Sequence, residues 1–324
     1  MDLLKSEQDT RSVRAMKGRR RRLVEYTRKT VIKEIRAKTL VTRVRGLDTY
    51  FGLDYGMNLY RGCQHHCVYC DSRSLCYGIE AFDRDVLIKA NAIELLESEL
   101  QRKRKKGIVG TGSMNDPYMP IEEKVRLTQR ALEVIAAYGF GAHVVTKSDL
   151  VLRDVPLLQR ISRTGSAIVS LTVTTIDDRL SRMIEPGAPP TSSRLRALKA
   201  LADAGIETRI ALMPTLPFIE DTWENVSAIV EAAARCGVAA IVPWFGMSMR
   251  DRQRAYFYAR LDELFPGVRA RYEARYGESY MCPSPQASAL FAQFTTRCEQ
   301  LGVATSVQPS LAPTGEQLDL FDAG

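Results

Sequence analysis

The sequence of 324 residues contains no apolar run long enough to cross a membrane. A spanning helix needs roughly 18 or more consecutive apolar residues, and no stretch comes near that length. The first residues are polar and basic, and they lack the apolar core of a secretory signal. Internal repeats at the periods of solenoid proteins are also missing. These absences argue against membrane and repeat architectures and predict a cytoplasmic protein.

Cysteine is scarce and unevenly placed. There are seven cysteines, and four of them lie in the stretch RGCQHHCVYCDSRSLC, residues 61–76, together with two of the three histidines. An odd number of cysteines cannot form a complete set of disulfides. Clustering in one loop indicates metal binding in a reducing compartment.

Negative charge is short at the start of the chain. Residues 1–46 hold 15 Lys and Arg against 5 Asp and Glu, whereas the rest holds 31 against 33. A second basic run, RKRKK, covers residues 102–106. A basic N-terminal arm over residues 1–46 predicts contact with a polyanion such as nucleic acid, since Lys and Arg bind phosphates irrespective of base sequence. The alternative is a solvated leader without a ligand.

Short apolar runs alternate with amphipathic stretches in the middle of the chain. Continuous apolar runs of about five to eight residues are typical of strands buried on both faces. Alternation of such strands with helices favours a parallel sheet in the α/β class, and an eight-unit barrel usually needs about 250 residues. Residues 47–248 therefore predict an incomplete (β/α)6 TIM-like barrel. The expected strands lie at 55–60, 107–113, 142–148, 167–175, 208–216 and 239–246, and the helices at 123–139, 192–206 and 221–237.

The pattern changes after the barrel. Residues 249–305 read as helices without a convincing strand and predict a C-terminal helical cap on the open side of the barrel. Residues 306–324 are punctuated by Pro and Gly and predict a flexible tail.

The clustered cysteines Cys63, Cys67 and Cys70 have the spacing C-x3-C-x2-C, directly after the first expected strand. Structural zinc would need a fourth ligand, for which His65, His66 or Cys76 are available, but zinc modules usually present two separated pairs. Three thiolates in one tight loop suit a cubane iron–sulfur cluster with one iron left open. A zinc-stabilised nucleic-acid-binding protein remains the non-enzymatic alternative.

This spacing, with the aromatic Tyr69 before the last cysteine, resembles the radical SAM superfamily, and the resemblance spans roughly residues 55–246. It implies a [4Fe–4S] cluster that binds S-adenosylmethionine (SAM). It also implies cleavage of SAM to a 5′-deoxyadenosyl radical, which abstracts hydrogen from the substrate. An electron donor of the flavodoxin or ferredoxin type is implied as a partner.

Four flanking phrases narrow the resemblance to the spore photoproduct lyase-like branch, also described as DNA repair photolyase-like. They are NLYRGCQHHCVYC (58–70), NDPYMPIE (115–122), VVTKSDLVLRD (144–154) and EPGAPP (185–190). The branch implies a lyase-like reaction on DNA or another nucleic acid. Radical modification of a peptide or small metabolite remains the enzymatic alternative.

The resemblance also assigns cofactor-binding residues. Lys147 is expected to reach the SAM carboxylate, and Ser113 and Asp116 the SAM ammonium, while Tyr69 belongs to the cluster loop. Ser170 and Thr172 fall on one strand face by period two, and facing inward they are expected to bond the ribose hydroxyls.

One departure concerns the returning hydrogen atom. Spore photoproduct lyase carries a hydrogen-donating cysteine on the loop after the second strand, whereas residues 110–114 here read GTGSM. Cys76, Cys282 and Tyr118 are the remaining candidates for a catalytic role. Finally, Gln317, Leu318, Leu320 and Phe321 of the tail resemble the peptide by which bacterial DNA-maintenance proteins dock on the replicative sliding clamp, so that clamp is a predicted partner.

Overall fold

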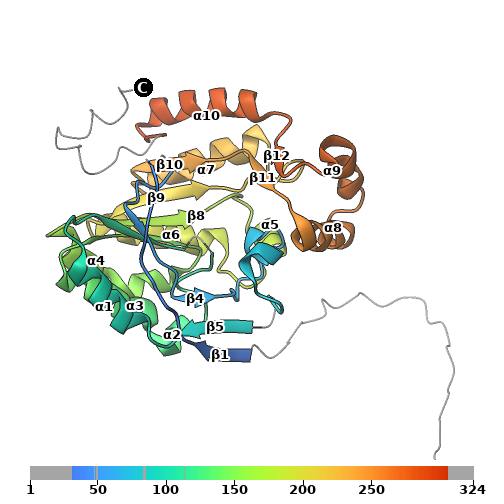
Figure 1. The fold of residues 1–324 in the computed structure, drawn as a ribbon. Helices are drawn as coiled ribbons and strands as arrows, with labels where there is room; N and C mark the ends of the chain where they lie inside the picture. Colours follow the sequence, from blue (N-terminus) through green and yellow to red (C-terminus); the bar gives the residue numbers. More distant parts are fainter. Residues whose placement is uncertain (1–30, 47, 49, 83–84, 113, 306–324) are drawn as a thin grey trace, which may run out of the picture.

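The computed structural model describes residues 31–46, 48, 50–82, 85–112 and 114–305. Its centre is a seven-stranded sheet in the order β10-β9-β8-β7-β6-β3-β2 (Figure 1). Neighbouring strands from β3 to β10 are parallel, and β2 is antiparallel at one edge. The strands are β2 (Thr42–Arg43), β3 (Tyr55–Gly56), β6 (Ile108–Thr111), β7 (Gly141–Thr146), β8 (Ala167–Thr172), β9 (Glu207–Leu212) and β10 (Ala240–Pro243).

The parallel strands lie in the predicted apolar runs, but of the strand expected at 55–60 only residues 55–56 join this sheet, while residues 60–61 belong to a second sheet. Burial on both faces explains the runs, since every residue of β8 is buried. The strand order ends in β2 and β10, so the described sheet is an open one. The prediction of an α/β fold of the partial TIM-barrel type is confirmed in this sense.

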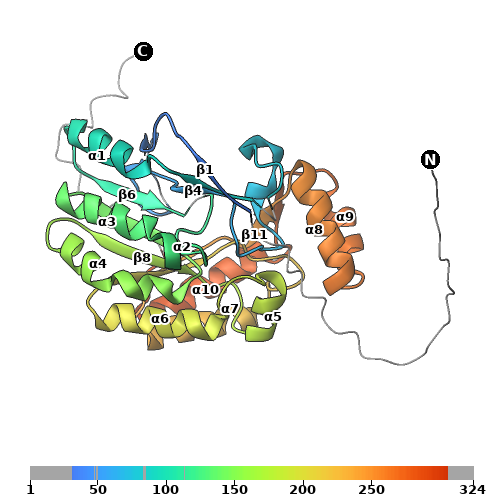
Figure 2. The ribbon, with the colours of Figure 1, turned by 90° about the horizontal axis from the view of Figure 1, so that it is seen from below.

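Helices cover the outer face of the sheet (Figure 2). The expected helix at 123–139 is divided at Arg126, whose φ of 52° interrupts it, and the helix expected at 221–237 begins after the N-cap Thr222. The helix α10 packs alongside α7. The bounds are α1 (Ala92–Arg102), α2 (Glu122–Val125), α3 (Leu127–Ala137), α4 (Val155–Ser162), α5 (Asp178–Ile184), α6 (Thr191–Asp203), α7 (Trp223–Arg235) and α10 (Ala287–Leu301).

Part of the predicted basic arm is built into the fold. The strand β1 (Val31–Ile35) pairs with β5 (Asp85–Lys89), which also pairs with β4 (Tyr60–Arg61), in a second sheet. Leu40 and Val41 are buried, and their backbone N–H groups donate to the Glu99 carboxylate at 3.0 and 2.7 Å. Residues 1–30, with the four consecutive arginines, lie outside the described residues.

The predicted cap, residues 249–305, consists of the helices α8 (Asp251–Leu264) and α9 (Val268–Tyr276) on one side and the helix α10, which packs on α7, on the other. The helix α8 lies beside the cysteine loop, and α9 packs against α8 (Figure 2). Here a second core joins the cap residues Phe257 and Tyr272 to Val68 of that loop. The expectation of no strand after residue 249 is wrong, because β12 (Met281–Pro283) pairs antiparallel with β11 (Gly246–Ser248).

Within the part of the chain that the structure describes, none of the helices combines the length and apolarity that crossing a bilayer requires. The tail with the clamp-like peptide, residues 306–324, lies outside the described residues.

Candidate active site

A cavity of about 250 Å³ lies at the carboxyl ends of the parallel strands. Each of these strands from β6 to β10 contributes a residue from its last position or directly after it. This is the end of α/β barrels where active sites are built. The contributing residues are Gly112, Thr146, Lys147, Thr172, Met213 and Trp244.

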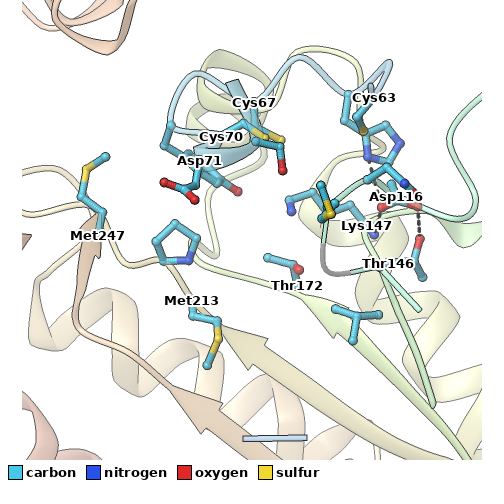
Figure 3. A pocket seen from close by; sticks show the side chains of 18 of the residues that line it. Cys63, Cys67, Cys70, Asp71, Asp116, Thr146, Lys147, Thr172, Met213 and Met247 are labelled. Carbon is cyan, nitrogen blue, oxygen red and sulfur yellow. Dashed lines mark hydrogen bonds and ion pairs between the residues drawn. The ribbon is translucent and has the colours of Figure 1, made fainter. Parts of the chain in front are cut away.

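The cysteine loop forms one wall of the cavity. Cys63, Cys67 and Cys70 all line it, and Figure 3 shows their sulfur atoms near the Lys147 ammonium. Burial raises the pKa of all three thiols, that of Cys63 to about 12. A raised pKa keeps these thiols protonated and therefore poorly nucleophilic, whereas binding to iron would deprotonate them.

The donor set fits a cubane cluster better than zinc. In a cubane each thiolate binds a different iron, so three thiols around one cavity are enough when one iron is left open. His65 is engaged elsewhere, 3.2 Å from Asp116, and Cys76 faces Arg250. Three cavity-facing thiols without a fourth protein ligand are the set that a [4Fe–4S] cluster with one open iron would use.

Lys147 reaches into the same cavity from the end of β7. Its ammonium lies 5.8 Å from the Tyr69 ring centroid and 3.9 Å from Glu185 Oε1. Burial lowers the pKa of Lys147, but Cys67 and Glu185 raise it by more, so the side chain is a cation. A cation beside three thiols suits an anionic group of a bound ligand.

Asp116 lines the cavity, but the chain itself occupies its carboxylate. Oδ1 accepts from Thr146 Oγ1 at 2.6 Å and from the Tyr118 N–H at 2.8 Å, while Oδ2 accepts from the Lys147 N–H at 2.7 Å. Burial raises the pKa of Asp116, yet the interaction with His65 and the hydrogen bonds from Thr146 and the Lys147 N–H lower it below its ordinary range. Asp116 therefore fixes the loop after β6 to the end of β7. Its predicted contact with the SAM ammonium stays a prediction.

The remaining predicted cofactor residues lie at different depths. Thr172 lines the cavity. Ser170, two residues earlier on β8, is not among the lining residues, and its hydroxyl lies 2.7 Å from His143 Nε2. Burial, followed by the charge of Arg209, lowers the pKa of His143 to about 3, so this histidine is neutral. Tyr69 lines the cavity. Ser113 lies outside the described residues.

The three catalytic candidates do not line the cavity. Cys76 is exposed, with its sulfur 3.5 Å from Arg250 Nη1, and Cys282 is buried in the second core. The Tyr118 hydroxyl donates to Asp154 at 2.9 Å. Among the described lining residues, the cluster cysteines are the sole thiols.

Sequence reasoning considered Trp244 as a pocket residue but missed the rest of the opposite wall of the cavity. This wall is formed by Met213, Pro214, Trp244 and Met247, with Ser248 and Asp71 at its polar edge. Two methionines and an aromatic ring suit a flat or apolar group. Met213 directly follows β9, as Trp244 follows β10, so reading the residue after each predicted strand would have found it.

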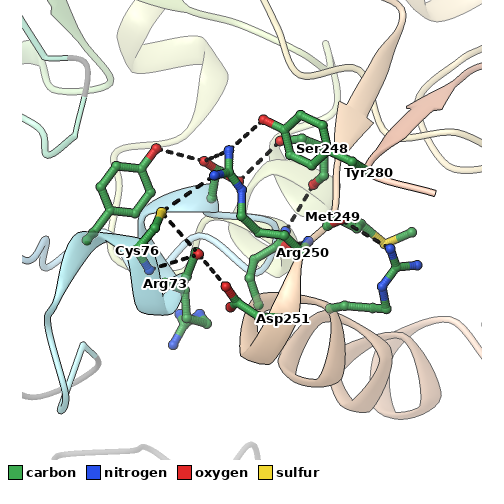
Figure 4. Close-up of polar contacts among 12 residues, drawn as sticks. Arg73, Cys76, Ser248, Met249, Arg250, Asp251 and Tyr280 are labelled. Atoms are coloured by element: carbon green, nitrogen blue, oxygen red, sulfur yellow. Dashed lines mark hydrogen bonds and ion pairs between the residues drawn. The ribbon is translucent and has the colours of Figure 1, made fainter. Parts of the chain in front are cut away.

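Residues 250–253 hold the cysteine loop from the side of the cap (Figure 4). Arg250 makes a two-pronged ion pair with Asp71, Nε–Oδ1 and Nη2–Oδ2 both at 3.1 Å. Asp251 accepts from the Ser74 hydroxyl at 2.6 Å, and Gln253 donates to the Tyr69 carbonyl at 3.1 Å. The start of α8 therefore fixes the chain on both sides of Cys70.

Residues 184–187 hold the same loop from the other side. The Val68 N–H donates to the Ile184 carbonyl at 2.8 Å, and the Gly187 N–H donates to the His65 carbonyl at 2.9 Å. A Cβ at Gly187 would stand 2.1 Å from the Gln64 carbonyl oxygen. A glycine is needed here because the two backbones touch. The EPGAPP phrase, which begins at Glu185, is thus the back support of the cysteine loop.

The second basic run lies away from the cavity. Residues 102–106 precede β6, at the amino ends of the parallel strands. Lys103 and Lys106 lie over the rings of Tyr55 and Phe140, at 4.6 and 4.5 Å from the centroids. This run is therefore outside direct reach of a substrate in the cavity.

Comparison with known proteins agrees with this geometry. The family model described as the radical SAM superfamily matches residues 57–242. The chain belongs to the radical SAM superfamily. An uncharacterized protein of Mycobacterium tuberculosis is 29% identical over 237 residues, which cover 71% of this chain and 69% of the relative. An uncharacterized protein of Methanocaldococcus jannaschii is 35% identical over 172 residues, covering 52% of this chain and 63% of the relative.

Solved structures extend the match to the fold. A spore photoproduct lyase variant with bound AdoMet and dinucleoside spore photoproduct aligns with a TM-score of 0.64 at 16% identity, covering 85% of this radical SAM chain and 81% of that chain. The predicted resemblance to spore photoproduct lyase is confirmed for the fold, which at this identity is as far as the likeness reaches.

Proposed function

We propose that this radical SAM enzyme acts by hydrogen abstraction on DNA or another nucleic acid, in a photoproduct-lyase-like repair or modification reaction. One observation carries the proposal. A single cavity joins the three cluster thiols and Lys147 on one wall to an apolar wall with Trp244 on the other. The first wall suits the cofactors, and the second suits a flat group such as a nucleobase.

The cofactors would be held by residues of the first wall. Cys63, Cys67 and Cys70 would hold a [4Fe–4S] cluster, and Lys147 would pair with the SAM carboxylate. When bound, the cluster and SAM would supply one-electron cleavage of SAM to a 5′-deoxyadenosyl radical, which abstracts hydrogen from the substrate. Thr172, which lines the cavity, would donate to a ribose hydroxyl, and the side chains of Met213 and Met247 would help to exclude water.

Three features support a nucleic-acid substrate. The fold is similar to that of a lyase solved with a dinucleoside photoproduct. The chain carries an excess of basic residues before β1, and the apolar wall offers an aromatic ring for stacking. A flavodoxin- or ferredoxin-type donor would supply the electron, and the cytoplasm would supply the reducing conditions.

The proposal is tested by anaerobic reconstitution with iron and sulfide, followed by dithionite and SAM. 5′-Deoxyadenosine is measured by chromatography without nucleic acid, with intact DNA, with UV-irradiated DNA and with RNA. We expect one nucleic acid to stimulate its formation several-fold over the arm without nucleic acid. A Cys67→Ala variant serves as the control without cluster.

Two results would argue against the proposal. A colourless protein that binds zinc and no iron under these conditions would contradict the radical SAM assignment of the site. Stimulation by a peptide extract but by no nucleic acid would leave the chemistry standing and overturn the substrate class.

A further inference from the structure

We infer that Glu185 and Arg194 form a buried charge pair that sets the electrostatic potential at the cysteine loop, with Glu185 as a positioning residue for Tyr69 and Lys147. This inference rests on the proposed function, because it concerns a cluster held by that loop. It gives the EPGAPP phrase a role that packing alone does not require.

The pair is closed off from water. Glu185 and Arg194 are each 1% exposed, and Glu185 Oε2 lies 2.5 Å from Arg194 Nη2. Burial raises the pKa of Glu185, but Arg194 and Lys147 lower it below its ordinary value, so the carboxylate is ionised. A buried ion pair costs desolvation energy that an apolar pair of the same size would avoid. Stability alone therefore does not explain why this ion pair is buried here.

The other oxygen of Glu185 faces the cofactor side. Oε1 accepts a short hydrogen bond from the Tyr69 hydroxyl and lies 3.9 Å from Lys147 Nζ. At that separation the carboxylate attracts the ammonium but leaves its N–H donors open to a closer anion. Glu185 thus orients Lys147 toward the cavity without saturating it.

Arg194 is fixed independently of its partner. Its Nε donates to the Pro189 carbonyl at 2.8 Å, and its Nη1 donates to the Thr172 carbonyl at 2.9 Å. The guanidinium therefore cannot follow a shortened or neutral side chain at position 185. If the carboxylate is removed, the positive charge of Arg194 remains in place and unbalanced.

Both charges act on the cysteine loop. The Glu185 carboxylate accepts a hydrogen bond from the hydroxyl of Tyr69, which lies between Cys67 and Cys70 in the chain, and Arg194 lies 2.5 Å from the other oxygen of that carboxylate. The potential of an iron–sulfur cluster depends on nearby charges and hydrogen bonds. A negative charge nearby disfavours addition of an electron, and a positive charge favours it. The two members of the pair should therefore shift the midpoint potential in opposite directions.

The test is a double-mutant cycle read by potentiometry and EPR rather than by turnover. We expect Glu185→Gln to move the midpoint potential of the reconstituted cluster to more positive values and Arg194→Met to more negative values. The double variant should return close to the wild-type potential. Glu231→Gln and Arg297→Met, the members of a partly exposed ion pair at 2.7 Å, are matched controls and should cause no shift.

The outcomes separate the inference from the proposed function. Wild-type potentials in all variants that keep their iron would overturn the inference and leave the radical SAM site untouched. If a single variant loses iron, the double variant decides. A double variant that retains iron at the wild-type potential supports the charge pair. A double variant that also loses iron would show that residues 185 and 194 only support the structure of the loop. A wild-type protein that assembles no cluster would instead contradict the proposed function.

Discussion

The backbone N–H of Lys147 donates to the Asp116 carboxylate at 2.7 Å, so the main chain of the cavity lysine is held independently of its side chain. Truncation of that side chain should leave the strand end in place. We therefore expect Lys147→Ala to retain iron and to lose SAM affinity by about ten- to hundredfold, since a charge-assisted bond contributes about 1.5–3 kcal/mol.

The measurement is SAM titration of the reconstituted protein by calorimetry, beside an iron assay. Lys199→Ala is the matched control, because Lys199 is exposed and pairs with Asp203 on the outer helix α6. Equal SAM affinity in the two variants would remove Lys147 from the cofactor site.

A second prediction concerns the cysteines outside the cavity. Cys76→Ser and Cys282→Ala should retain iron and form 5′-deoxyadenosine at the wild-type rate, because neither thiol lines the cavity. Cys70→Ala should lose the cluster. Loss of product formation on nucleic acid in Cys76→Ser, with 5′-deoxyadenosine formation intact, would restore Cys76 as a hydrogen donor.

The predictability of this fold from sequence follows from where its strands lie. The strands β6, β7 and β8 are buried along nearly their whole length, so their apolar runs are continuous and easily recognised. The strand β1 (VIKEI) is mostly exposed, and pairing with β5 rather than hydrophobicity determines it. The short strand β12 is likewise set by its pairing with β11, which leaves no local pattern.

The site was predictable to a similar extent. Spacing identified the three cluster cysteines, and their placement around one cavity agrees with it. The sequence could not tell that the Asp116 carboxylate is occupied by Thr146 and backbone donors, nor that Ser170 bonds a histidine. Both facts depend on which side chains meet across neighbouring strands.

A third prediction uses the buried Glu220. Its carboxylate accepts from Thr174 and the Leu216 N–H, without a cation among the contacts that the structure records, and burial raises its pKa to about 8 from an ordinary 4.5. A raised pKa means that the folded state binds the proton more tightly than the unfolded state. Its contribution to stability is complete below about pH 4.5 and is lost as pH rises toward 8, by up to about 1.4 kcal/mol per pH unit.

Chemical denaturation of wild type and Glu220→Gln between pH 5 and 8 checks this. The variant should show a flatter dependence of its unfolding free energy on pH, whatever its absolute stability. Glu224→Gln, at an exposed position of α7, should keep the wild-type slope. Parallel slopes for Glu220→Gln and wild type would contradict a protonated Glu220.

A fourth prediction concerns the basic residues before β1. Because β1 pairs with β5 and begins at Val31, a deletion should end at residue 30 to leave the fold intact. Removing residues 1–30 should weaken DNA binding and flatten its dependence on log salt concentration, by about 0.9 units for each lost phosphate contact. Fluorescence anisotropy at several salt concentrations measures both. Identical slopes would make this segment a solvated leader.

The last prediction concerns the tail peptide, which stays a prediction from sequence. A fluorescent peptide of residues 312–324 should bind purified bacterial sliding clamp saturably, and changing Leu320 and Phe321 to Ala should abolish binding, because these side chains would fill the apolar pocket. Indistinguishable titration curves for the two peptides would end the idea of clamp docking.

The two supports of the cysteine loop, residues 184–187 and 250–253, have a consequence for biosynthesis. Both are translated long after Cys63, Cys67 and Cys70 have left the ribosome. The cysteine loop therefore lacks the hydrogen bonds from residues 250–253 until the α8 segment has emerged and docked. We expect iron to be bound stably only after the α8 segment has been synthesised and has docked on the cysteine loop.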